Sequence, residues 1–157
     1  MTTRNPDPAK VASLAKDLTK DFPRSPRKLL AGHVLGFRML DKCRATLAGT
    51  NGEYHFDCPL DHMILGFTGI KADDFKAFVA TGATDEEVAA WVAEHTAPHT
   101  KLEVAKWNNG LRYLRLSEAE DRIQEYMEDY VQQNISEERQ HQIKYFFDIY
   151  DLEEKRF

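Results

Sequence analysis

Apolar residues recur along most of the chain at spacings of three and four, which is the period of a helix with one buried face. Val11, Leu14 and Leu18 share the first such face. The same spacing predicts further helices with these inward-facing groups: Phe37, Leu40, Cys43 and Leu47; Phe75, Phe78 and Val79; Val88, Trp91 and Val92; residues between Leu102 and Leu116; Ile123, Tyr126, Met127, Tyr130 and Val131; and Ile143, Phe146, Phe147 and Tyr150. Such faces are stabilised mainly by packing on one another, so the pattern predicts a compact all-α bundle of about eight helices.

Residues that favour helix ends mark several of these segments. Ser25-Pro26 is typical of an N-cap followed by proline at the first helical position, and predicts a helix that the following glycines loosen. Thr84 and Ser117 each precede a glutamate by three residues, which predicts two capping boxes. Ser136 predicts the cap of a last long helix.

One stretch departs from the helical pattern, near residues 50–58. Asn51-Gly52 indicates a turn, and residues 53–57 could be briefly extended. Cys58-Pro59 then predicts the start of a short helix that stops at Gly69. We therefore expect one irregular loop in an otherwise helical fold.

Length and composition are those of an ordinary globular protein. With 157 residues, of which 42% are hydrophobic and 30% charged, we expect one helical domain over residues 1–157, in which residues 1–8 form a flexible N-terminal tail. The apolar runs are short and interrupted by charge, so we expect no membrane span, and the polar first residues do not resemble a signal peptide. Two cysteines without a CxxC pair favour free thiols and a cytoplasmic location.

Charge is distributed unevenly along the chain. Residues 1–49 contain ten lysine and arginine residues against four aspartates, whereas residues 50–157 contain eleven against twenty-two acidic residues. The basic first third could cradle an anionic ligand, or it could simply pair with the acidic helices of the same fold. A net charge of −5 without a basic stripe argues against nucleic acid as the main partner.

Several short segments, taken in order, resemble a known family. They are residues 18–27 (LTKDFPRSPR), 39–45 (MLDKCRA), 58–61 (CPLD), 67–70 (FTGI) and 84–88 (TDEEV). This order resembles the bacterial family called domain of unknown function 5069, chiefly over residues 15–95. The resemblance implies a bacterial helical protein, and it implies no reaction, ligand or cofactor.

Cys58 is the first candidate for chemistry. A thiol beside a helix N-terminus is favoured as the thiolate by the unpaired N–H groups and the helix dipole. His55 lies three residues upstream and could act as a base, while Asp61 could bond back to the cap region. The alternative is a structural cysteine, because cysteine is among the most often buried residues. Whether the protein is an enzyme therefore stays open.

A second candidate is the cluster of charges at Arg38, Asp41, Lys42 and Arg44. Arg38 and Asp41 are three residues apart, as are Asp41 and Arg44, so their side chains can meet on one helix. They could clamp a carboxylate or phosphate, with Asp41 positioning an arginine. The alternative is a pair between Asp41 and an arginine, with the remaining charges reaching water.

We expect neither a metal ion nor a cofactor. His55, Asp57, Asp61 and His62 have metal-ligating groups, but their spacing matches no known motif. Glu138 to His141 fits the Glu-x-x-His pattern of di-iron bundles but lacks a second copy. A Gly-rich phosphate loop and a His-Glu-x-x-His motif are also missing from the sequence.

Two functional hypotheses follow. The first is a protein that binds a small anionic molecule, with Arg38, Lys42 and Arg44 supplying charge and residues 54–62 forming a wall. The second is a non-catalytic homodimeric interaction module, anchored by Phe146, Phe147, Tyr150 and Phe157. In addition, Asn109 and Arg112 share a helix face and could line a polar pocket.

Overall fold

The computed structural model of the chain describes residues 4–157. Within that range the protein has eight α-helices, two short 3₁₀ helices and no β-strand, which confirms the predicted all-α class. Contacts divide these residues into two compact units, one made of residues 4–24 and 28–99 and the other of residues 25–27 and 100–157. A single domain over the whole chain stays a prediction.

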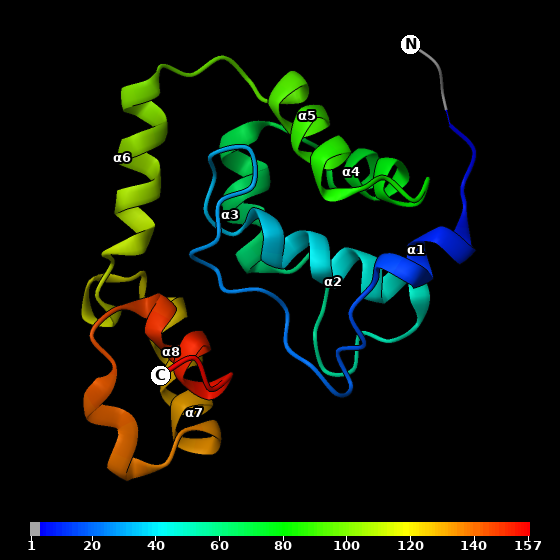
Figure 1. The fold of residues 1–157 in the computed structure, drawn as a ribbon. Helices are drawn as coiled ribbons and strands as arrows, with labels where there is room; N and C mark the ends of the chain where they lie inside the picture. Colours follow the sequence, from blue (N-terminus) through cyan, green and yellow to red (C-terminus); the bar gives the residue numbers. More distant parts are fainter. Residues whose placement is uncertain (1–3) are drawn as a thin grey trace. The chain divides into compact units, whose positions relative to one another are not determined.

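The first unit contains α1 (Pro8–Leu14), α2 (Gly36–Ala48), α3 (Pro59–Thr68), α4 (Ala72–Val79) and α5 (Asp85–His95) (Figure 1). Helix α2 is its centre, because α1, α3 and α4 all contact it. The core residues are almost completely buried: Leu30, Leu40, Cys43, Ile64, Phe75, Val79 and Val88. Each large side chain among them contributes roughly 1.5–3 kcal/mol by leaving water.

The second unit contains α6 (Lys101–Arg112), η1 (Leu116–Glu118), α7 (Asp121–Asn134), η2 (Glu137–Gln142) and α8 (Phe146–Glu153). Helix α8 contacts α6, and the main-chain N–H of Phe146 donates to the carbonyl of Leu114 at 2.8 Å. The buried residues of α8 include Phe146, Phe147, Ile149 and Leu152.

Three predicted helix boundaries are confirmed. Helix α3 begins at Pro59 with Cys58 as its N-cap, and Gly69 ends it with a left-handed φ of +75°. Helix α5 begins with the predicted capping box, in which the Glu87 main-chain N–H donates to the Thr84 side chain and the Thr84 main-chain N–H donates to the Glu87 side chain. All three signals depend on residues no more than four positions apart, so the local sequence suffices to set them.

The helix predicted after Ser25-Pro26 is wrong. Residues 26–35 form turns, with an isolated bridge between Leu30 and His33. Ala31, Gly32 and Leu35 have φ values of +50°, +79° and +71°, which a right-handed helix cannot contain. At Gly36 the chain passes close to Leu30. A Cβ at that glycine would lie 2.4 Å from the Leu30 Cβ.

Two boundaries in the second unit also differ from the prediction. Ser117 lies inside η1 instead of capping a helix, and α7 begins at Asp121. The last long helix is interrupted between η2 and α8. Asp148 explains the break, since its Oδ2 accepts hydrogen bonds from the main-chain N–H groups of Lys144 and Tyr145, at 2.9 and 2.8 Å, and so caps a new helix.

The predicted N-terminal tail is described in part. Residues 1–3 lie outside the described residues. The main-chain N–H of Asp7 donates to the carbonyl of Ala80 at 2.9 Å, and the Asp7 side chain caps α1 by accepting from Lys10. The start of α1 is therefore held to the segment that follows α4.

Candidate functional site

Helix α2 carries four charged side chains that are almost completely buried. Counted as whole residues, Arg38, Asp41, Lys42 and Arg44 expose 2%, 3%, 3% and 4% of their surface. A buried charge is costly unless an opposite charge or several hydrogen bonds compensate it. The partners of these four residues therefore decide whether the cluster is available to a ligand.

The carboxylate of Asp41 is held by Arg24, from the loop that precedes α2. Asp41 Oδ2 accepts from the main-chain N of Arg24 at 2.8 Å, and Oδ1 accepts from Arg24 Nη2 at 2.8 Å. The Arg24 guanidinium also lies 4.0 Å from the ring centroid of Phe37. The sequence predicted an arginine partner for Asp41, but the arginine that holds it comes from outside the helix.

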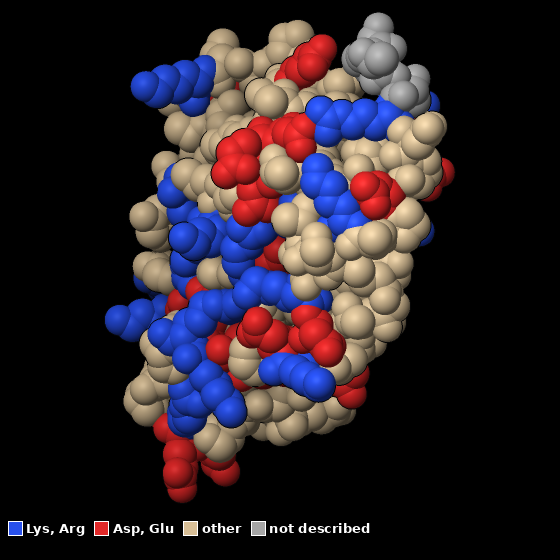
Figure 2. All heavy atoms as spheres, turned by 45° about the vertical axis from the view of Figure 1, so that its right-hand side comes forward, with Lys and Arg blue, Asp and Glu red and all other residues tan. Residues whose placement is uncertain are grey.

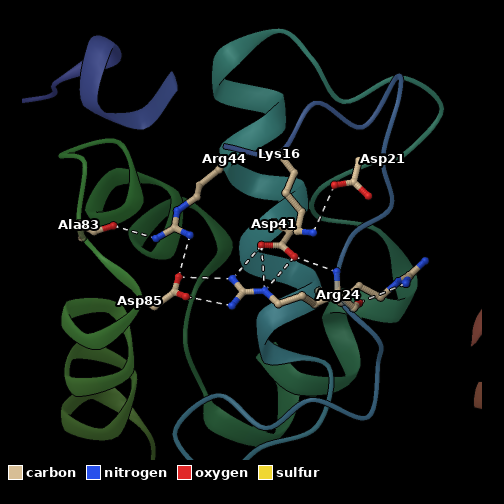
Figure 3. A network of polar contacts seen from close by, with 8 residues as sticks. Lys16, Asp21, Arg24, Asp41, Arg44, Ala83 and Asp85 are labelled. Atoms are coloured by element: carbon tan, nitrogen blue, oxygen red, sulfur yellow. Dashed lines mark hydrogen bonds and ion pairs between the residues drawn. The ribbon is translucent and has the colours of Figure 1, made fainter. Parts of the chain in front are cut away.

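Arg24 and Arg44 share a second carboxylate, that of Asp85 at the start of α5 (Figure 3). Asp85 Oδ2 lies 2.9 Å from Arg24 Nη1, and Oδ1 lies 2.8 Å from Arg44 Nη1. Arg44 Nη2 also donates to the carbonyl of Ala83 at 3.0 Å. Two arginines and two aspartates thus balance each other and join the loop before α2, α2 itself and the start of α5.

Ionisation in this network follows from the pairing. Burial alone would lower the pKa of Arg24, but its hydrogen bonds and charge interactions with Asp41 and Asp85 outweigh burial and raise that pKa. Burial would likewise raise the pKa of Asp85, yet hydrogen bonds from Arg24 and Arg44 hold it below its ordinary value. Arg24 and Asp85 are therefore both kept in their charged forms.

Lys42 has a different partner, Asp61 in the first turn of α3. Lys42 Nζ lies 2.8 Å from Asp61 Oδ1, and both side chains are nearly inaccessible, exposing 4% and 2%. The other oxygen of Asp61 accepts from the main-chain N of Asp57 at 2.9 Å, which matches the predicted bond back to the cap region. Lys42 Nζ also lies 3.3 Å from the Sγ of Cys58, so the ammonium group contacts both a carboxylate and a thiol.

Lys42, and not His55, is the titratable neighbour of Cys58. The side chain of His55 is exposed, and no hydrogen bond joins it to Cys58 within residues 4–157. Cys58 itself is half-buried, whereas Cys43 is completely buried, and burial raises the pKa of Cys43 to about 12. The sequence did not indicate this neighbour, because Lys42 lies sixteen residues before Cys58 and approaches it from another helix.

The cations predicted to bind a ligand thus already have interaction partners inside the first unit. Lys42 and Arg44 pair with Asp61 and Asp85. The guanidinium of Arg38 lies 5.6 Å from the ring centroid of Tyr54 and donates to the carbonyl of Arg24 at 3.4 Å. On the face shown in Figure 2, blue lysine and arginine atoms also lie directly beside red acidic atoms in several places.

A cavity lies within the second unit. It has a volume of about 430 Å³ and is open to solvent on one side. Its walls are formed by the end of α6, the segment that leads into α8, and residue 27. The lining residues are Arg27, Arg112, Tyr113, Gln142, Lys144, Tyr145, Asp148 and Phe157.

The side chains of this cavity carry three positive charges and one negative charge. The carboxylate is that of Asp148, whose Oδ1 lies 2.7 Å from Arg27 Nη2 and whose Oδ2 caps α8. Arg27 also pairs with Asp151 at 2.6 Å. Arg112 differs, because its side chain makes no hydrogen bond or ion pair within residues 4–157, and its Nε is buried without a partner.

Aromatic rings form the less polar part of the cavity. The rings of Tyr113 and Tyr145 meet edge to face, with centroids 5.8 Å apart, and Phe157 lies at the wall with about half of its surface exposed. The sequence indicates a polar pocket at Asn109 and Arg112, and of these two only Arg112 lines the cavity. The other lining residues were missed, because Arg27 and Lys144 are distant in sequence from Arg112 and from each other, and no motif connects them.

Two further searches concern metals and membranes. Among residues 4–157, no group of three or more histidine, cysteine, aspartate or glutamate side chains is arranged to hold a metal ion. None of the helices in the same range has both the length and the apolar character needed to cross a bilayer.

These observations define an all-α protein with a buried ion-pair network in one unit and a positively lined cavity in the other. The model of the family described as a domain of unknown function (DUF5069) matches residues 20–156, and the chain belongs to that family. The resemblance seen in the sequence is thereby confirmed and extends through the C-terminal third. The comparison with curated proteins found no match.

Proposed function

We propose that this protein binds a small anionic molecule in the cavity of its second unit, with Arg112 as the main anchor. The observation that carries the proposal is the guanidinium of Arg112, which lines the cavity without a hydrogen-bond or ion-pair partner in the described chain. A guanidinium group presents a planar fork of donors that fits a carboxylate or phosphate. An anion would supply the partner that the chain does not.

Charge and shape support the same class of ligand. Lys144 adds a second cation to the lining, while the Asp148 carboxylate is already bonded to Arg27 and to the start of α8. A volume of about 430 Å³ suits a small molecule. Because Tyr113 and Tyr145 form part of the wall, the ligand we expect carries an apolar or aromatic portion beside its anionic group.

The ligand class is the one predicted from the sequence, whereas the binding site that we propose lies at the end of α6 and not on α2. We assign a structural role to Lys42 and Arg44, since carboxylates of the same unit compensate their charges. We also propose a bacterial, cytoplasmic protein, which the resemblance to a bacterial family and the two free cysteines support.

The alternative of a homodimer has less support from the structure. Phe146 and Phe147, two of its proposed anchors, expose 2% and 0% of their surface and belong to the core of the second unit. Phe157 is about half exposed and lies at the cavity. We therefore do not assign the C-terminal aromatic residues to an interface.

The test is calorimetric titration of the intact protein with phenyl phosphate and benzoate as probes, and with benzyl alcohol as a neutral analogue of similar size. We expect the anions to bind and the alcohol to bind much more weakly. Arg112→Gln should weaken anion binding roughly tenfold or more, because a hydrogen bond to a charged group contributes about 1.5–3 kcal/mol.

Arg122→Gln is the matched control, since Arg122 is an exposed arginine of α7 outside the cavity lining. It removes the same charge from the chain and should leave binding unchanged. Arg112→Lys should recover part of the affinity by restoring the charge without the planar fork. Equal binding of anion and alcohol, or equal effects of Arg112→Gln and Arg122→Gln, would contradict the proposal.

A further inference from the structure

Lys42, Cys58 and Asp61 form a compact reactive cluster at the start of α3. The Lys42 nitrogen lies 3.3 Å from the Cys58 sulfur and 2.8 Å from an oxygen of Asp61. Lys42 comes from α2, Cys58 is the N-cap of α3 and Asp61 lies in the first turn of α3, so the cluster is created by the packing of two helices. The cavity of the second unit does not include any of these residues.

Cys58 is more exposed to solvent than Lys42 and Asp61. Cys58 is half-buried, so part of the residue is exposed to solvent. The side chain of Lys42 exposes only 4% of its surface and is held in place by Asp61. The nitrogen is therefore positioned beside the sulfur and is shielded from most reagents that would modify it directly.

We propose that Lys42 and Cys58 are an oxidative modification site, at which a hydroperoxide converts the pair into a covalent nitrogen–sulfur cross-link. This inference does not depend on the proposed anion binding. The oxidant class is small hydroperoxides, with hydrogen peroxide as the simplest member. The product is a sulfenamide, which forms when a sulfenic acid condenses with a nitrogen nucleophile.

The first step oxidises the sulfur by two electrons. The sulfur of Cys58 attacks one peroxide oxygen, so that an S–O bond forms as the O–O bond breaks. The second peroxide oxygen takes the thiol proton and leaves as water from hydrogen peroxide, or as an alcohol from an organic hydroperoxide. Cys58 is then a sulfenic acid, and the peroxide has been reduced.

The second step uses the neighbouring nitrogen. Asp61 takes one proton from the Lys42 ammonium group, with which its Oδ1 is in contact at 2.8 Å. The amine attacks the sulfur, so that an N–S bond forms and the S–O bond breaks. The departing hydroxide takes a second proton from the nitrogen and leaves as water. The cross-link then joins α2 to the start of α3.

Cys43 provides an internal comparison for this chemistry. It is completely buried in α2, and burial raises its pKa to about 12. The thiolate is the nucleophilic form, so Cys43 should remain reduced under conditions that oxidise Cys58. Both thiols can therefore be followed in the same sample.

The experiment exposes the folded protein to a small excess of hydrogen peroxide, alkylates the remaining thiols after unfolding, and maps the peptides by mass spectrometry. We expect a peptide pair linked through Lys42 and Cys58, about 2 Da lighter than the two unmodified peptides together and separated again by a thiol reductant. Cys43 should be recovered in its alkylated form.

Lys42→Arg is the matched control, because arginine keeps the positive charge beside Asp61 but does not lose its proton to become a nucleophile. In that variant Cys58 should proceed to sulfenic and sulfinic acids without a cross-link. The wild-type peptide map decides the question even if the variant folds poorly. A wild-type Cys58 that resists oxidation, or that oxidises while Lys42 remains unmodified, would overturn the proposal.

Discussion

The guanidinium of Arg24 and the carboxylate of Asp41 form a multiply bonded pair whose members lie seventeen residues apart. The same carboxylate also accepts from the main-chain N–H of Arg24, so one aspartate fixes both the backbone and the side chain of the preceding loop. Because Asp41 is almost completely buried, this pair is expected to control the stability of the first unit.

Asp41→Asn should destabilise the protein by about 3 kcal/mol. Removing one partner of a buried ion pair leaves the other uncompensated and typically costs 3–5 kcal/mol, and we expect about the lower end since Arg24 is one quarter exposed and keeps Asp85. Urea unfolding followed by circular dichroism measures the change. The exposed Asp129→Asn should change stability by less than about 0.5 kcal/mol, and a similar loss in both variants would contradict the prediction.

Stability should fall in acid partly through Asp85. Its pKa is held below the ordinary value of 3.8 in the folded state, so the unfolded chain takes up a proton first as the pH decreases. The contribution of Asp85 is therefore complete well above pH 3.8 and is lost as the pH falls from there through the folded pKa. Above that pH range, Asp85 should not contribute to the pH dependence of the free energy of unfolding.

Urea midpoints measured at several values between pH 7 and pH 3 test this prediction. Asp85→Asn should be less stable than wild type at neutral pH and should lose less stability in acid, because it removes the group that titrates. The control Asp129→Asn should follow the wild-type profile. Parallel acid profiles for wild type and Asp85→Asn would show that the Arg24 and Arg44 pairs with Asp85 do not matter energetically.

Two glycines in helices should respond to alanine in opposite directions. A Cβ at Gly36 would lie 2.4 Å from the Leu30 Cβ, so Gly36→Ala should force the chain apart and destabilise by about 1–3 kcal/mol. A Cβ at Gly66, in α3, would meet no atom within 4 Å. Gly66→Ala should therefore stabilise by about 0.5–1 kcal/mol through its better helix propensity. Thermal unfolding of both variants checks the signs, and two effects of the same sign would contradict the close approach at Gly36.

The two cysteines should differ sharply in the folded protein. At pH 8, iodoacetamide should modify the half-buried Cys58 and leave the buried Cys43 unreacted, since burial raises the pKa of Cys43 to about 12. Denaturation should make both react. Mass spectrometry after timed quenching gives the occupancy at each site, with Cys58→Ser as the control that abolishes native-state labelling. Two equivalents in the native protein would show that the first unit opens readily.

The sequence determined those features that depend on close neighbours in the chain. The period of the apolar residues indicates an all-α protein, Cys58-Pro59 and Gly69 mark both ends of α3, and Thr84 with Glu87 marks the start of α5. In each case, a hydrogen bond or a φ preference acts over at most four residues, so the pattern is visible without the fold. Where left-handed residues such as Ala31 interrupt a helical signal, the same local reasoning was wrong.

Only the tertiary structure decided which charge meets which. Arg24 pairs with Asp85, which lies 61 residues further along the chain, and Arg27 pairs with Asp148, 121 residues further along. The sequence carries no periodic signal over such separations. Packing also placed Lys42 beside Cys58 and left Arg112 without a partner at a cavity. The sequence shows the number and type of charges, but burial and pairing decide which are compensated inside the fold and which can meet a ligand.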